Sequence, residues 1–270
     1  MRSGGALRVR WVAAVIAAAM SLGLSNPALA QGSKSKTCQH EAIGTGRVAA
    51  VKDARTLMLD DGREVRLAGI ESPDADSGPG RAAIAALTEW ATGQTVGLRR
   101  SGPERDRYGR VLAHVFIEGA QPEQSLQQRL LAAGHARAAT SGGCIADSLV
   151  FERQARTANL GLWADPYYQV KRAEHAAEVL TQRGHFAIVE GTVLSVRESG
   201  GTIYVNFGRR WSEDFTATIP KRSERAFAAA GLEPKQLERR VVRVRGWIEE
   251  RGGPWIDLAG PEQIEIAERK

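Results

Sequence analysis

Short strand-like runs and helical segments follow one another between residues 44 and 163. In order, the strand-like runs are GRVAAV, TLMLDD, EVRLAGI, TVGLRR and RVLAHVFIEG. The DDGR between the second and third runs is typical of a hairpin turn. After the third run, Ile84, Leu87 and Trp90 recur at helical spacing until Gly93 ends the pattern. The sequence therefore predicts a small sheet accompanied by helices.

Two more helical segments close this half of the chain. One is EQSLQQRLLAAGH, with Leu126, Leu130 and Ala133 on one face, and the other is DSLVFERQARTANLGLW. Strands with helices packed over them are typical of a small β-barrel with helical cover, as in OB folds. We therefore expect an α+β barrel domain with three helices over residues 44–165.

The segment 166–185 is charged on most faces, and we expect a solvated connecting helix there. Strand-like runs return after Gly184, with the helical run SERAFAAAGL between the third and fourth of them. Because strands and helix follow the order of an OB fold, residues 186–268 are predicted to form a second OB-like β-barrel domain.

This second half contains aromatic and basic side chains that could bind a single nucleic-acid strand by base stacking beside a basic groove. The alternatives are that the aromatic residues form the core and the arginines the solvated face. The half could also bind the first domain, an envelope glycan or another protein. The aromatic candidates are Tyr204, Phe207, Trp211, Phe215, Trp247 and Trp255, and the basic ones are Arg209, Arg210, Arg239, Arg240, Arg243 and Arg245.

The first thirty residues are typical of an export signal. MRSGGALRVR carries three arginines and no acid, and an uncharged apolar run follows it. That run is shorter than the roughly 20 residues that span a bilayer. It ends at the small-residue pattern Ala28-Leu29-Ala30, so we expect a mature chain from Gln31 in a bacterial periplasm or outside the cell. The alternative is an uncleaved N-terminal anchor. We expect residues 31–43 to be a polar, flexible lead-in. No membrane-spanning segment is expected in the mature chain.

Charge and cysteine content add two expectations. The formal net charge of +6 falls to +3 when the three arginines of the signal are removed, which is compatible with a polyanionic partner. Cys38 and Cys144 are the two cysteines, and in an oxidising compartment such a pair suggests a disulfide. Two unpaired thiols are the alternative.

Several motifs in the first half resemble the thermonuclease family, the secreted staphylococcal-nuclease-like phosphodiesterases. They run in the family's order from Gly46 to Trp163 and are VKDARTLML, VRLAGIESPD, DRYGRVLA, the helix end LLAAGHA, and ERQARTANLGLW. The resemblance implies an OB-type barrel with three helices. It also implies an endonuclease that hydrolyses phosphodiester bonds in single-stranded DNA or RNA.

The resemblance assigns roles to two groups of basic residues. Arg66 and Arg110 fall on the family's two catalytic arginine positions. A guanidinium suits this role because it is planar, always charged and able to hold two phosphate oxygens. Asp106 would orient these arginines, while Arg107 and Tyr108 match groups that hold the terminal phosphate and stack on a base. The alternative is that DRYGR is a solvated turn.

The resemblance also implies a calcium site. In the family, two aspartates and a backbone carbonyl hold Ca²⁺, and a glutamate lies beside the attacking water; oxygen ligands of this kind suit calcium. Here the second ligand falls on Glu71, the carbonyl on Ser72 and the glutamate on Asp74, a catalytic position. Asp53 matches an aspartate close to the metal. The first ligand falls on Arg55.

A guanidinium in place of a carboxylate changes the local charge by two units and opposes binding of Ca²⁺. Two accounts of Arg55 are open. It either pairs with Glu71 or Asp74 and occupies the cation's place, or it points to solvent while Asp53, Glu71 and Asp74 form a weaker metal site. We expect a nuclease with an altered metal site. The alternatives are a degenerate nucleic-acid-binding protein, also suggested because the family's stacking tyrosine falls on Thr140, and an envelope interaction protein.

Overall fold

The computed structural model describes residues 41–139 and 145–267. The export signal, most of the lead-in, Cys38, Thr140 and Cys144 lie outside the described residues, so the predictions on processing and the disulfide stay predictions. Within the described part of the chain, no helix has the length and apolarity needed to cross a membrane.

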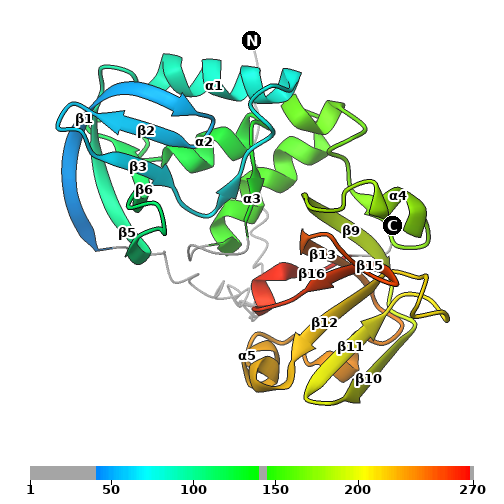
Figure 1. The fold of residues 1–270 in the computed structure, drawn as a ribbon. Helices are drawn as coiled ribbons and strands as arrows, with labels where there is room; N and C mark the ends of the chain where they lie inside the picture. The colour runs from blue at the N-terminus through cyan, green and yellow to red at the C-terminus, as the bar shows by residue number, and fades with distance from the viewer. Residues whose placement is uncertain (1–40, 140–144, 268–270) are drawn as a thin grey trace, which may run out of the picture. The chain divides into compact units, whose positions relative to one another are not determined.

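Five strands close a barrel in the order β1, β2, β3, β6, β5 (Figure 1). β1, β2 and β3 form an antiparallel meander, and β3 then pairs in parallel with β6. Side chains alternate along each strand, which buries Leu57 and Leu59 of β2 and Val65 and Leu67 of β3 in one core. The predicted barrel is confirmed. Its strands are β1 (Ala42–Asp53), β2 (Thr56–Leu59), β3 (Glu64–Leu67), β5 (Thr95–Arg105) and β6 (Val111–Ile117).

The predicted turn between β2 and β3 is present. Gly62 has φ +84°, a conformation that costs glycine little, and the Asp61 carboxylate accepts hydrogen bonds from the backbone N–H and Nε of Arg63. The turn therefore sets the register that places Arg66 opposite Thr56.

Three helices accompany the barrel: α1 (Gly78–Ala91), α2 (Leu126–Ala132) and α3 (Ile145–Thr157). Serine starts two of them. Ser77 accepts a hydrogen bond from the Gly80 N–H, and Ser125 forms a reciprocal capping box with Gln128.

A small antiparallel sheet joins β4 (Ile70–Glu71) to β7 (Arg137–Ala138), and it places Glu71 opposite Arg137. Sequence patterns did not predict this pair, because two-residue strands are too short to show a period. The sheet brings residues 66 positions apart in the sequence side by side next to the barrel.

The prediction of one connecting helix over residues 166–185 is wrong. The segment follows a 3-10 turn, η1 (Gly161–Ala164), and contains a short strand, β8 (Lys171–Arg172), and a five-residue helix, α4 (Ala176–Leu180). Lys171 and Tyr168 are buried, and β8 pairs with β9. Tertiary contacts therefore override the helical propensity of a charged segment.

The second half contains two sheets, in the orders β10-β11-β12-β15-β14 and β16-β13-β9-β8. The expected helix α5 lies between β12 and β13, but hydrogen bonding does not close the strands into a single barrel, so the prediction of a second barrel is not confirmed. The elements are β9 (Phe186–Thr192), β10 (Ser195–Ser199), β11 (Thr202–Asn206), β12 (Thr216–Pro220), η2 (Lys221–Ser223), α5 (Glu224–Ala229), η3 (Pro234–Leu237), β13 (Val241–Trp247), β14 (Glu249–Arg251), β15 (Gly253–Asp257), η4 (Pro261–Gln263) and β16 (Ile264–Ile266).

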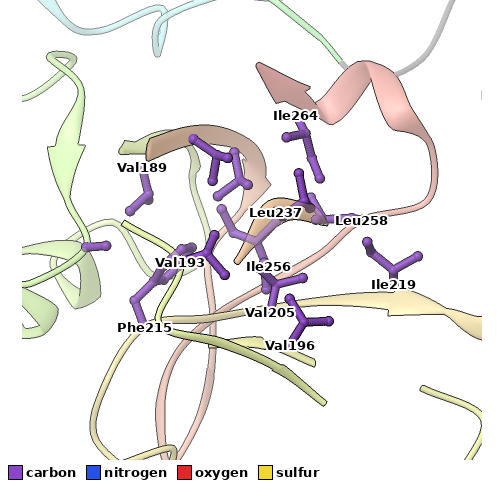
Figure 2. Packing of buried hydrophobic residues seen from close by; sticks show 14 of the residues in the cluster. Val189, Val193, Val196, Val205, Phe215, Ile219, Leu237, Ile256, Leu258 and Ile264 are labelled. Carbon is purple, nitrogen blue, oxygen red and sulfur yellow. The ribbon is translucent and has the colours of Figure 1, made fainter. Parts of the chain in front are cut away.

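One apolar core lies between these sheets, and Figure 2 shows Val189, Val193, Phe215 and Ile256 converging in it. Of the six aromatic candidates for base stacking, Phe215 and Trp255 are buried, while Trp211 and Trp247 are exposed. The core therefore uses some of the predicted platform residues and leaves others at the surface.

Arg245 of β13 connects the second half to α3. Its guanidinium is buried and donates to both carboxylate oxygens of Glu152, at 2.9 and 3.1 Å, to the carbonyl of Ala138 at 3.0 Å, and to Glu265. Burial alone would lower the pKa of Arg245, but the two carboxylates raise it above its usual value. Arg245 is thus a buried structural cation, and the interpretation of it as part of a solvated face is wrong.

Candidate functional site

Arg66 lies in the middle of a cluster of guanidinium groups. It is carried by β3, between Thr56 of β2 and Leu112 of β6. Burial, and then the positive charges of Arg55 and Arg110, lower the pKa of Arg66, which shows that the three cations lie within electrostatic reach of one another. Arg55 and Arg66 line a hollow of about 170 Å³, which we call the Arg66 hollow.

Arg110 is held by the loop between β5 and β6. Asp106 accepts hydrogen bonds from the backbone N–H groups of Tyr108 and Arg110, at 2.9 and 3.0 Å, and from Nε of Arg110 at 2.7 Å. Burial alone would raise the pKa of Asp106, but the hydrogen bonds from Arg110 and Tyr108 lower it. Asp106 therefore fixes both the loop and the direction of the Arg110 side chain, in line with its predicted orienting role.

Tyr108 is exposed at the tip of the same loop, with 68% of its surface accessible. The guanidinium carbons of Arg107 and Arg110 lie 4.9 and 5.1 Å from the centre of its ring. A ring exposed between two cations can stack on a base next to a bound phosphate. The segment is a turn whose side chains form an organised group, and the roles of Arg107 and Tyr108 at a phosphate and a base stay predictions.

Arg55 pairs with Glu71. Its Nη1 donates to the Glu71 carboxylate and, at 3.2 Å, to the carbonyl of Ile70. Its backbone N–H donates to the Asp53 carboxylate at 2.8 Å, so Asp53 stabilises the turn that presents Arg55. Both charged side chains are largely buried. The structure therefore agrees with the account in which Arg55 pairs with Glu71, and not with the one in which it points to solvent.

The predicted calcium ligands do not fit the ion. The guanidinium of Arg55 covers the carboxylate of Glu71, Asp53 is engaged in its turn, and no cluster of three or more His, Cys, Asp or Glu side chains suited to a metal exists among the described residues. A positive charge already at this position repels a second one. At a separation of 4 Å and an effective dielectric near 20, each pair of unit charges costs about 4 kcal/mol.

Asp74 lies beside a different pocket from Arg66. Its side chain is 71% exposed and belongs to a pocket of about 240 Å³ that also includes Ser72, while its carbonyl accepts a hydrogen bond from the Ser77 hydroxyl. The Arg55–Glu71 pair lines both this pocket and the Arg66 hollow. Arg110 lines a third hollow together with Tyr108, so Arg66, Arg110 and Asp74 lie beside three different pockets.

Sequence reasoning missed the other residues of that pocket: Arg137, Tyr167 and His185. Trp247 also lines it, and was predicted as one of several candidate platforms. These residues come from four separate segments, so spacing in the sequence could not show that they meet. A larger hollow of about 780 Å³, lined by parts of β1, β5 and β6, contains none of the predicted site residues.

Comparison with protein-family models matches residues 64–165 to the staphylococcal nuclease homologue family. The matched span includes Arg66, Asp106 and Arg110, and it begins at β3 of the barrel. A comparison with curated proteins finds no match. The chain therefore carries a staphylococcal nuclease homologue domain at residues 64–165.

Proposed function

We propose that the domain binds the phosphodiester backbone of single-stranded DNA or RNA through Arg66 and Arg110. The observation that carries this proposal is geometric: β3 pairs Arg66 with Leu112, two residues from Arg110, and Arg66 lines a hollow together with Arg55. Burial first, and then the charges of Arg55 and Arg110, lower the pKa of Arg66. Bringing like charges together in a half-buried site is unfavourable, and a polyanion bound there relieves the repulsion.

The arrangement suits a phosphate more than a carboxylate or a metal ion. Arg110 is already oriented by Asp106, so little side-chain entropy is lost when it binds an oxygen. Glu71 is neutralised by Arg55 and therefore repels an incoming phosphate less than a free carboxylate would. Exposed Tyr108 provides a stacking surface for a neighbouring base.

Binding of a fluorescently labelled single-stranded oligonucleotide tests this proposal. We expect Arg66→Ala and Arg110→Ala each to weaken binding about tenfold or more, because a charge-assisted contact contributes about 1.5 to 3 kcal/mol. Affinity should also fall with salt as phosphate contacts release counterions, and chelator should leave it unchanged. Arg225→Ala, which removes an exposed arginine of α5, is the matched control and should have little effect. Unchanged affinity in both site variants would refute the assignment.

Hydrolysis of the bound strand is the second candidate function. It is favoured by the family of the domain and by two carboxylates, Glu71 and Asp74, next to the arginine cluster. It is opposed by the Arg55–Glu71 pair, which leaves no calcium site among the described residues. A cleavage assay on single-stranded DNA and RNA, with calcium and with chelator, separates a binding domain from a nuclease.

A further inference from the structure

The pocket beside Asp74 is shared between the nuclease homologue domain and the residues that follow it. Its lining includes Arg137, Tyr167, Tyr168, His185, Phe186 and Trp247, and we call it the aromatic pocket. Apart from Arg137, all of them lie beyond residue 165, outside the matched domain. Its volume of about 240 Å³ suits a single flat ring system.

Two exposed rings in this pocket are held by two buried ones. Trp247 is 52% exposed and meets buried Phe186 edge-on, with ring centres 6.4 Å apart. Tyr167 is 36% exposed and meets buried Tyr168 edge-on at 4.9 Å. Such contacts fix the orientation of the exposed rings, so their faces are available without further ordering.

Arg137 is the buried cation of the pocket. It is 5% exposed, and its guanidinium carbon lies 5.3 Å from the ring centres of both Tyr168 and Phe186. Its Nε has no hydrogen-bond partner among the described residues. Burial lowers the pKa of Arg137. A buried donor without a partner is unfavourable, so a ligand that offers an acceptor oxygen or nitrogen would satisfy it.

The rim carries acidic and hydrogen-bonding groups. His185 Nε2 lies 4.0 Å from the Asp74 carboxylate, and Glu71 lines the pocket as well. A phosphate would be repelled by the exposed carboxylate of Asp74, and an aliphatic ligand would leave Arg137 unsatisfied. A neutral, flat ring with acceptors at its edge fits both the walls and the buried cation.

The position of the pocket connects it to the proposed phosphate site. The Arg55–Glu71 pair lines the aromatic pocket on one side and the Arg66 hollow on the other. A strand with a phosphate at Arg66 therefore has a neighbouring nucleotide next to the aromatic pocket. Resting on the proposed function, we infer that the aromatic pocket is a nucleobase subsite, in which a base stacks on Trp247 and Tyr167 and accepts a hydrogen bond from Arg137.

Two ligands of equal length and charge test this inference: an oligothymidylate and the same oligonucleotide without bases. We expect Trp247→Ala and Tyr167→Ala each to weaken binding of the oligothymidylate about tenfold, since stacking on an aromatic side chain is lost. Binding of the abasic strand should stay unchanged. Trp247→Phe should keep most of the affinity. Leu194→Ala, which removes a 47% exposed apolar side chain elsewhere in the second half, is the matched control and should leave both affinities unchanged.

The outcomes separate this subsite from the phosphate site. If Arg66→Ala weakens both ligands while the Trp247 and Tyr167 variants bind like wild type, the subsite is refuted and the phosphate site stands. An equal loss of affinity for both ligands in the Trp247 and Tyr167 variants also refutes the subsite, because the loss does not depend on bases.

A base-dependent loss of affinity in these variants, with Arg66→Ala and Arg110→Ala unchanged, supports the subsite and refutes the phosphate site. Wild-type protein that binds neither ligand refutes both. Circular dichroism establishes that each variant is folded.

Discussion

At the scale of single residues, Arg55 sets the charge at the position where a metal ion was predicted. Its guanidinium lies on Glu71 and on the carbonyl of Ile70, where the resemblance to thermonucleases implies a calcium ion. We propose that the guanidinium of Arg55 takes the place of the divalent cation that the resemblance implies. The two arginines proposed to bind phosphate are held by the chain itself, since Asp106 fixes Arg110 and β3 carries Arg66.

Arg55→Asp tests this replacement directly. The variant removes the cation from Glu71 and returns a carboxylate to the family's ligand position, so we expect calcium affinity to rise by tenfold or more. Isothermal titration with Ca²⁺ measures the affinity, and a zymogram with and without calcium measures cleavage. Arg55→Gln is the control, because it removes the positive charge without adding a carboxylate. Calcium binding by wild type as tight as by Arg55→Asp would contradict this account.

At the scale of elements, short pieces of structure position the candidate site. The two-residue strands β4 and β7 bring Glu71 next to Arg137, and the β5–β6 loop directs Arg110. On the opposite side of β7, the carbonyl of Ala138 and the carboxylate of Glu152 meet Arg245 of β13. The ion pair between α3 and β13 therefore supports the strand that carries Arg137.

Arg245→Met should destabilise the protein by about 3 kcal/mol, because it removes the buried cation shared by Glu152 and Glu265 and leaves Arg156 as the cation close to both. Arg243→Met is the matched control on the same strand. Arg243 pairs with Glu190 in a more exposed position, so we expect a loss below about 1 kcal/mol. Urea unfolding of both variants measures the difference. Equal losses in the free energy of unfolding would show that the buried ion pair contributes no more to stability than the more exposed one.

The same network predicts a dependence on pH. Burial alone would raise the pKa of Glu265, but Arg245 and Arg156 lower it below its ordinary value. The unfolded state then binds more protons than the folded state as pH falls, so the stability from this pair is complete above a pH of about 4.3 and is lost as pH drops through the lowered pKa. Glu265→Gln should flatten the fall in stability over that acidic window.

At the scale of the whole molecule, the two halves share buried contacts and the aromatic pocket. The connection between them is an ordered segment, because Tyr168 and Lys171 are buried and β8 pairs with β9. The second half consequently contributes Trp247 and Phe186 to a pocket next to the nuclease homologue domain. Its proposed role is to add base contacts to a site whose phosphate contacts come from the first half.

Export and the disulfide are further predictions for the whole chain. Cleavage after Ala30 and a bond between Cys38 and Cys144 should give protein from the bacterial envelope that begins at Gln31 and is two hydrogens lighter than its reduced form. Intact-mass measurement before and after reduction checks both. A retained N-terminus would contradict the first expectation, and two thiols that react with alkylating reagent without reduction would contradict the second.

The amino-acid sequence by itself determined the barrel and its three helices, and it indicated Arg66 and Arg110 as the candidate phosphate-binding positions. Strand alternation, serine caps and the DDGR turn are local signals, and the motifs around Arg66 and Arg110 keep their order along the chain. Tertiary structure alone decided the partner of Arg55, the burial of Arg245 and the gathering of Arg137, Tyr167, His185 and Trp247. The physical reason is that ion pairs and pockets form between segments distant in sequence, where neither period nor propensity acts.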